Sequence, residues 1–125
     1  MIFNYPKDTD HHKSEDQLQA ACFQWAYNSF PDIRGLLWSV PNGGSRHPLE
    51  AAKFKATGVT EGVHDLHMLW KGQFTTFELK HGNNTMTPGQ KLWAAKIDAQ
   101  GANVFSCYTL LQFQQAFIKA YTCQQ

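Results

Sequence analysis

Two acidic residues and a lysine are spaced so that they could form one chemical site. Asp65 is followed thirteen residues later by the tripeptide Glu78-Leu79-Lys80. The run 64–70 is rich in apolar and aromatic residues and predicts a β-strand. Lys71-Gly72 fits a two-residue hairpin turn, and 73–80 fits the returning strand. The sequence therefore predicts a β-hairpin that carries these residues.

In this register Asp65 lies opposite Glu78, and their Cβ atoms would be about 4.5–5.5 Å apart. Side chains alternate along a strand, so Glu78 and Lys80 share a face while Leu79 points away. Two opposed carboxylates destabilise a hairpin, and a divalent cation between them would reverse that effect. Hard oxygen ligands favour Mg²⁺ or Mn²⁺. A solvated polar face without a metal ion is the alternative interpretation.

The hypothesis of a metal site gives each residue a role in phosphodiester hydrolysis. Asp65 and Glu78 would hold the ion, and the Leu79 carbonyl could complete the coordination. The ion would polarise the phosphodiester and lower the pKa of a bound water. Lys80 would position or deprotonate that water, or neutralise the developing charge. A simple salt bridge to one of the acids is the other explanation for Lys80.

Two polar residues on helical stripes could support this site. Glu15 precedes Leu18 and Cys22 at helical spacing, so it projects from the inward face of the first turn. An acid there could equally serve only the helix dipole. Gln90 has the same relation to Trp93 and could hydrogen-bond Lys80 or a metal-bound water. A capping role in its own helix explains Gln90 equally well.

A glycine-rich loop and the helix after it could bind phosphate. Small residues let backbone N–H groups approach an anion, and Arg46 could contact a phosphate in bidentate fashion. Two lysines make the following helix locally basic. A glycine pair is also a common turn signal. The candidate nucleic-acid-binding residues are Asn42, Gly43, Gly44, Ser45, Arg46, Lys53 and Lys55.

The composition limits the class of protein. The chain has 125 residues, the size of one domain, and 42% of them are hydrophobic. The formal net charge of +1 gives no global basic field, so nucleic-acid binding would need a local patch. No apolar run approaches the roughly 20 residues of a membrane span. Three scattered cysteines and a polar start without a signal peptide favour a reducing, cytoplasmic compartment.

The order of elements predicts an α/β domain. Residues 1–13 read as a flexible arm and 14–125 as one domain. Helices are expected from Ser14, over 48–57, from Thr87 and from Thr109, because Ser or Thr caps or an N-terminal proline mark their starts. Strands are expected at 36–40, in the hairpin and at 103–108. The order α-β-α-β-β-α-β-α gives a mixed β-sheet flanked by helices.

This ordered set of residues resembles the VRR-NUC branch of the PD-(D/E)xK nuclease superfamily, as found in small phage and bacterial proteins. The resemblance covers about Glu15 to Cys107. One departure is His64, where the family usually has proline before the aspartate. The matching residues are Glu15, Pro41-Asn42-Gly43-Gly44, Arg46, Gly58, Gly62, Asp65, Glu78-Leu79-Lys80, Gln90 and Trp93.

The resemblance implies a restriction-endonuclease-like core and a Mg²⁺- or Mn²⁺-dependent DNA endonuclease that leaves 5′-phosphate and 3′-hydroxyl ends. It implies metal ligation by Asp65, Glu78 and the Leu79 carbonyl, and a catalytic Lys80 supported by Glu15 and Gln90. Small members resemble junction-resolving enzymes, so a homodimer acting on branched DNA is expected, with no membrane partner. The alternatives are a non-catalytic nucleic-acid-binding module with this fold and a plain α/β scaffold.

Overall fold

A five-stranded mixed sheet forms the centre of the described part of the chain, which comprises residues 1–41 and 48–123 in the computed structural model. The strand order is β1-β5-β4-β3-β2. The strands β1, β5 and β4 are parallel, whereas β3 is antiparallel to both of its neighbours. Their bounds are β1 Ile2–Asn4, β2 Leu37–Ser39, β3 Leu66–Trp70, β4 Gln73–Leu79 and β5 Asn103–Cys107.

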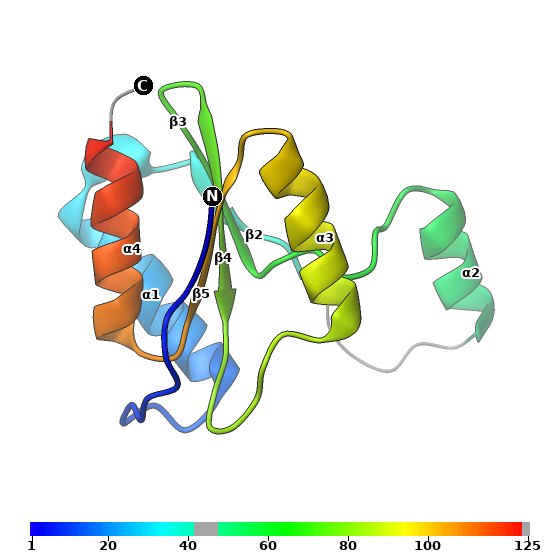
Figure 1. Ribbon diagram of the computed structural model, residues 1–125, viewed down its shortest axis with the longest axis horizontal. Coiled ribbons are helices and arrows are strands. Elements are labelled where there is room, and N and C mark those ends of the chain that lie inside the picture. Colours follow the sequence, from blue (N-terminus) through cyan, green and yellow to red (C-terminus); the bar gives the residue numbers. More distant parts are fainter. Residues whose placement is uncertain (42–47, 124–125) are drawn as a thin grey trace.

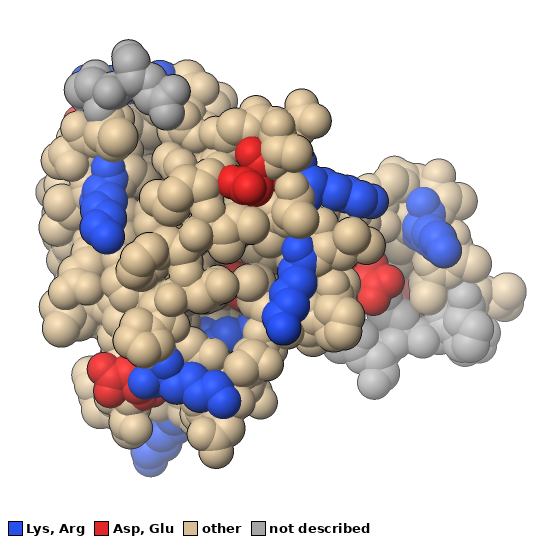
Figure 2. Space-filling view, in the orientation of Figure 1, with Lys and Arg blue, Asp and Glu red and all other residues tan. Residues whose placement is uncertain are grey.

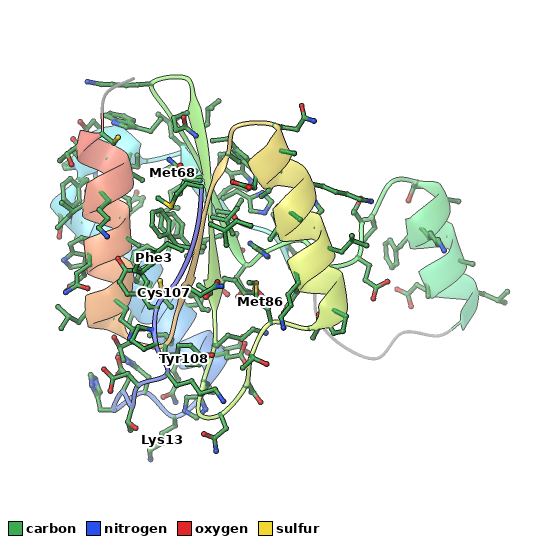
Figure 3. The ribbon with its side chains drawn as sticks, viewed as in Figure 1. Phe3, Lys13, Met68, Met86, Cys107 and Tyr108 are labelled. Atoms are coloured by element: carbon green, nitrogen blue, oxygen red, sulfur yellow. The ribbon has the colours of Figure 1, made fainter. Side chains whose placement is uncertain are left out.

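Helices lie on both faces of the sheet (Figure 1). The helices α1 (Glu15–Ser29) and α4 (Leu110–Thr122) cover one face, and α3 (Pro88–Ala99) covers the other. The helix α2 (Pro48–Ala56) stands apart from the sheet. Met68 and Cys107 lie on the α1 and α4 side, and Met86 lies on the α3 side (Figure 3). This arrangement agrees with the α/β fold expected from the sequence.

The predicted hairpin is present in the predicted register. Trp70 pairs with Gln73 and Leu66 with Phe77. Lys71 and Gly72 have φ values of 50° and 80°, as a type I′ turn requires at its two central positions. The strand β3 begins at Leu66 and not at His64, because β2 pairs with it only as far as Leu66.

The N-terminal segment differs from the loose arm expected over 1–13. Ile2–Asn4 forms β1, which pairs in parallel with β5, and Tyr5 is buried. The Gln112 side chain donates to the Pro6 carbonyl (2.9 Å), and the Leu110 N–H donates to the Asp10 carboxylate (2.8 Å). The segment therefore completes the sheet edge and binds the start of α4.

Side-chain caps fix where three helices begin, as the sequence predicted. Ser14 Oγ accepts from the N–H of Gln17 (3.1 Å), and Thr109 caps α4 in the same way. The Gln17 side chain accepts from the N–H of Lys13. In a full capping box it would accept from the N–H of the N-cap residue, Ser14. Both bonds of the box are present at α3. Leu18 and Cys22, which the sequence placed on one helical stripe, are buried on α1 together with Ala26.

Among the described helices, none is both long and apolar enough to cross a membrane.

Candidate active site

Asp65, Glu78 and Lys80 meet at one end of the β3–β4 hairpin. The N–H of Leu79 donates to Asp65 Oδ2 at 2.9 Å, which holds the Asp65 carboxylate beside the end of β4. Lys80 Nζ lies 3.8 Å from Glu78 Oε2, so these two side chains share a face. Both side chains are buried, and Asp65 is half-buried. The hairpin therefore brings the two acids and the lysine together.

Glu78 is the most unusual group of this cluster. Its side chain is only 1% exposed, and its Oε1 atom has no hydrogen-bond partner among the described residues. Burial raises the pKa of the Glu78 carboxyl well above its ordinary value, and the nearby Asp65 carboxylate adds to this effect. The positive charge of Lys80 acts in the opposite direction, while Glu15 raises the pKa further. A buried carboxyl with an unused oxygen and a second acid beside it is a donor set that suits a hard divalent cation.

Gln90 makes both of the contacts that the sequence left as alternatives. Its Oε1 atom accepts from Lys80 Nζ at 2.8 Å and from the backbone N–H of Thr87 at 2.9 Å. One oxygen thus completes the α3 cap and fixes the ammonium group of Lys80. The cap and the lysine contact are therefore not competing explanations.

Glu15 lies at the start of α1, close enough to Glu78 for its charge to raise the pKa of that carboxyl. Glu15 Oε2 accepts from Asn84 Nδ2 at 3.3 Å. The spacing of the sequence around Asn84 gives no signal for this contact. The structure thus brings Glu15, Asp65, Glu78, Lys80 and Gln90 into one region and adds Asn84 beside Glu15.

Of the expected phosphate-binding residues, the structure describes Lys53 and Lys55. Asn42, Gly43, Gly44, Ser45 and Arg46 lie outside the described residues. Lys53 and Lys55 are exposed on α2, away from the sheet (Figure 1). On the face shown in Figure 2, lysine and arginine residues are scattered over several elements and do not gather into one patch.

A second group of metal-ligand types occurs in the N-terminal segment. The ligand atoms of Asp10, His11 and His12 lie within 4.8 Å of one another. The Asp10 carboxylate, however, already accepts from the His12 backbone N–H, contacts the His12 ring and caps α4 at Leu110. These bonds account for its position without an ion.

Comparisons with known proteins give one match. Neither family models nor curated protein sequences match the chain. A solved structure described as a "VRR_NUC domain protein" superposes with a TM-score of 0.70 at 22% sequence identity, covering 89% of each chain. At this identity the likeness concerns the fold, and it agrees with the resemblance found in the sequence. The chain therefore has the fold of a VRR-NUC domain protein.

Proposed function

We propose that this protein is a metal-dependent DNA endonuclease of the VRR-NUC type that hydrolyses phosphodiester bonds in branched DNA. The observation that carries the proposal is the buried Glu78 carboxyl, whose Oε1 atom lacks a hydrogen-bond partner within the described part of the chain while Asp65 and Lys80 lie beside it. The VRR-NUC fold supports the same conclusion.

Asp65 and Glu78, with the Leu79 carbonyl, would hold Mg²⁺ or Mn²⁺. When bound, such an ion polarises the phosphodiester and lowers the pKa of a water ligand. Lys80, held by Gln90, would orient the attacking water or stabilise negative charge on the phosphate. Glu15, fixed by Asn84, would hold its negative charge at the edge of the same site.

The substrate is assigned from the family resemblance and from the basic residues. Arg46, Lys53 and Lys55, with the small residues Asn42 to Ser45, would contact DNA phosphates. The net charge of only +1 argues for binding through such a local set and not through a general positive field. A homodimer would present two sites to a four-way junction.

A cleavage panel tests this proposal. End-labelled four-way junctions, flaps, duplexes and single strands are incubated with Mg²⁺, Mn²⁺ or EDTA. We expect cleavage only with a divalent ion, with branched DNA preferred and 3′-hydroxyl products. Glu78→Gln should be inactive, and Lys71→Ala, at the far end of the hairpin, should retain activity. Binding to DNA without cleavage under every metal condition would favour the non-catalytic module, and cleavage in EDTA would contradict the metal site.

A further inference from the structure

His64 is fully buried between two elements of the candidate site. Its Nδ1 atom lies 2.9 Å from Thr76 Oγ1 on β4, and its Nε2 atom lies 3.3 Å from the Gln90 carbonyl oxygen on α3. The ring also packs edge-on against Trp93 of α3, with 4.9 Å between centroids. Both ring nitrogens are thus engaged, and they join the sheet to the first turn of α3.

The direction of one of these bonds is fixed. A carbonyl oxygen only accepts, so His64 Nε2 must donate to Gln90. When the ring is neutral, Nδ1 then accepts from the Thr76 hydroxyl. His64 therefore holds the backbone carbonyl of Gln90, while the side chain of Gln90 contacts Lys80.

Gln90 transmits this restraint to the lysine. Its backbone carbonyl is bound by His64, and its side-chain oxygen accepts from Lys80 Nζ. Thr76 and Glu78 lie on one face of β4, and Lys80, the residue that follows the strand, lies beside Glu78, so the contacts run from β4 through His64 and Gln90 back to the residue at the end of β4. A shift of the Gln90 backbone would move the hydrogen-bond acceptor of Lys80.

The segment 62–64, which includes His64, also approaches α3 closely at Gly62. Gly62 has a φ of +83°, and a Cβ atom at this position would lie 2.3 Å from the Gly89 carbonyl oxygen and 2.6 Å from its carbon. Only glycine allows this approach. The segment 62–64 therefore contacts the first turn of α3 at two points, immediately before Asp65.

We propose that His64 is a positioning residue for Lys80 that acts through Gln90, so that the segment carrying Asp65 also sets the position of the lysine. The inference rests on the proposed nuclease function for its kinetic consequence, but its structural consequence can be measured without cleavage.

Three substitutions separate the two hydrogen bonds of the ring. His64→Gln places an amide nitrogen where Nε2 lies and keeps a donor for the Gln90 carbonyl. His64→Asn places an acceptor where Nδ1 lies and keeps the bond to Thr76. His64→Phe keeps the ring packing against Trp93 and removes both bonds. We expect His64→Asn and His64→Phe to lower kcat about tenfold, with KM little changed, and His64→Gln to retain most activity.

A double-mutant cycle with Gln90→Ala tests the route of the effect. If His64 acts through Gln90, adding His64→Phe to Gln90→Ala should lower kcat little further. Losses that multiply would overturn the proposal, as would a His64→Gln protein as impaired as His64→Phe. If His64→Phe fails to fold, as judged by circular dichroism, the His64→Gln and His64→Asn pair decides.

The lysine itself gives a measurement that does not depend on cleavage. In metal-free protein, the Lys80 side-chain ammonium resonance should shift in His64→Asn and in Gln90→Ala but stay near its wild-type position in His64→Gln. An unchanged resonance in His64→Asn would overturn the inference even if the enzyme cleaves DNA. The expected shifts without any cleavage would instead support the inference and contradict the proposed function.

Discussion

At the scale of single residues, Glu78 is the group whose environment is hardest to explain without a ligand. Burial of an ionised carboxyl costs several kcal/mol unless it is well paired. Glu78 Oε2 lies 3.8 Å from Lys80 Nζ, and Glu78 Oε1 has no hydrogen-bond partner among the described residues. The raised pKa keeps the carboxyl protonated over a wider pH range and so reduces this cost. Metal binding would then require release of that proton.

The first prediction concerns Glu78→Gln. The amide resembles the protonated carboxyl in shape but is a poor ligand for a hard cation, so cleavage should be lost. Stability of the metal-free protein at pH 7 should match or exceed that of wild type, since no buried charge can form. Denaturant unfolding and DNA cleavage measure the two effects. Asp65→Ala and Lys80→Ala should also abolish cleavage, whereas Asp16→Asn, an exposed acid of α1, is the matched control.

An active Glu78→Gln protein would show that this acid is not part of the site.

The second prediction concerns pH and His64. Burial lowers the pKa of His64 to about 4. As the pH falls, the imidazole therefore becomes protonated in the unfolded chain before it does in the folded protein. The contribution of His64 to stability is complete above the unfolded pKa of 6.5 and is lost as pH falls towards 4. Between pH 7 and pH 5, wild type should lose about 2 kcal/mol more than His64→Phe in unfolding free energy.

Glu78 changes stability in the opposite sense, since its raised pKa favours the folded state at low pH, and His67 titrates in both proteins. These effects cancel in the comparison of the two proteins. Equal losses in wild type and variant would mean that His64 is not neutral in the folded state.

The residues that sequence could identify are those that a local rule relates to one another. Asp65, Glu78 and Lys80 follow from a two-residue turn and the alternation of a strand. The sequence shows His64 only as a departure from the family pattern, because its partner Gln90 lies 26 residues away in the chain. The role of Asn84 has no signal in the sequence, because its contact with Glu15 joins positions 69 residues apart. Contacts of this kind have no periodic signal.

At the scale of elements, the first turn of α3 is held from two sides. Its capping box fixes the helix start, and the segment 62–64 packs against it. Helix starts follow well from sequence, because a cap depends on residues three positions apart. The strand β1 cannot be predicted from the sequence in this way. Its three residues are too few to display alternation, and its pairing partner β5 lies about a hundred residues later.

The third prediction compares two glycines that both have positive φ. Alanine in the left-handed region costs about 1–2 kcal/mol at either position. At Gly62 the added Cβ also meets the Gly89 carbonyl, whereas at Gly58 no atom of the described residues lies within 4 Å. Gly62→Ala should therefore lose about 1–3 kcal/mol more than Gly58→Ala and should lower kcat in addition. Thermal melting and cleavage assays measure the two; equal behaviour would mean that the approach to α3 relaxes freely.

The fourth prediction concerns the N-terminal segment. Asp10→Ala removes the side chain that accepts from the N–H of Leu110 at the start of α4, and loss of such a cap costs about 1 kcal/mol. Asp8→Ala removes the same charge from an exposed site whose carboxylate binds only the adjacent Thr9 N–H within the described residues. In chemical denaturation, Asp10→Ala should have a lower free energy of unfolding than Asp8→Ala. Equal stabilities would indicate that this segment does not stabilise α4.

At the scale of the whole molecule, the site occupies one end of a small sheet, and on the face shown in Figure 2 the lysine and arginine residues are dispersed. One chain of 14.2 kDa has little surface with which to hold a branched substrate. A closed twofold dimer would supply two sites with fixed geometry. The sequence suggests this assembly only through the family resemblance, since no local rule relates residues to a partner surface.

The fifth prediction is therefore a homodimer that makes paired, symmetric nicks in a four-way junction. Light scattering should give twice the chain mass of 14.2 kDa at working concentration. Mixing wild type with excess inactive Glu78→Gln should convert paired nicks into single nicks, because mixed dimers carry one working site. A monomer mass with nicks that remain paired would contradict the dimer.

The central position of β4 has a consequence for hydrogen exchange. This strand pairs along both edges and carries Glu78, whereas Gln90 lies in the first turn of α3, on the outer layer. Backbone amides of central strands exchange only through global unfolding, while helix ends open in local fluctuations that cost less. Glu78 should then keep its position in the sheet in partly opened molecules in which the contact between Lys80 and Gln90 is already broken. Inactivation by mild denaturant would precede the loss of the sheet.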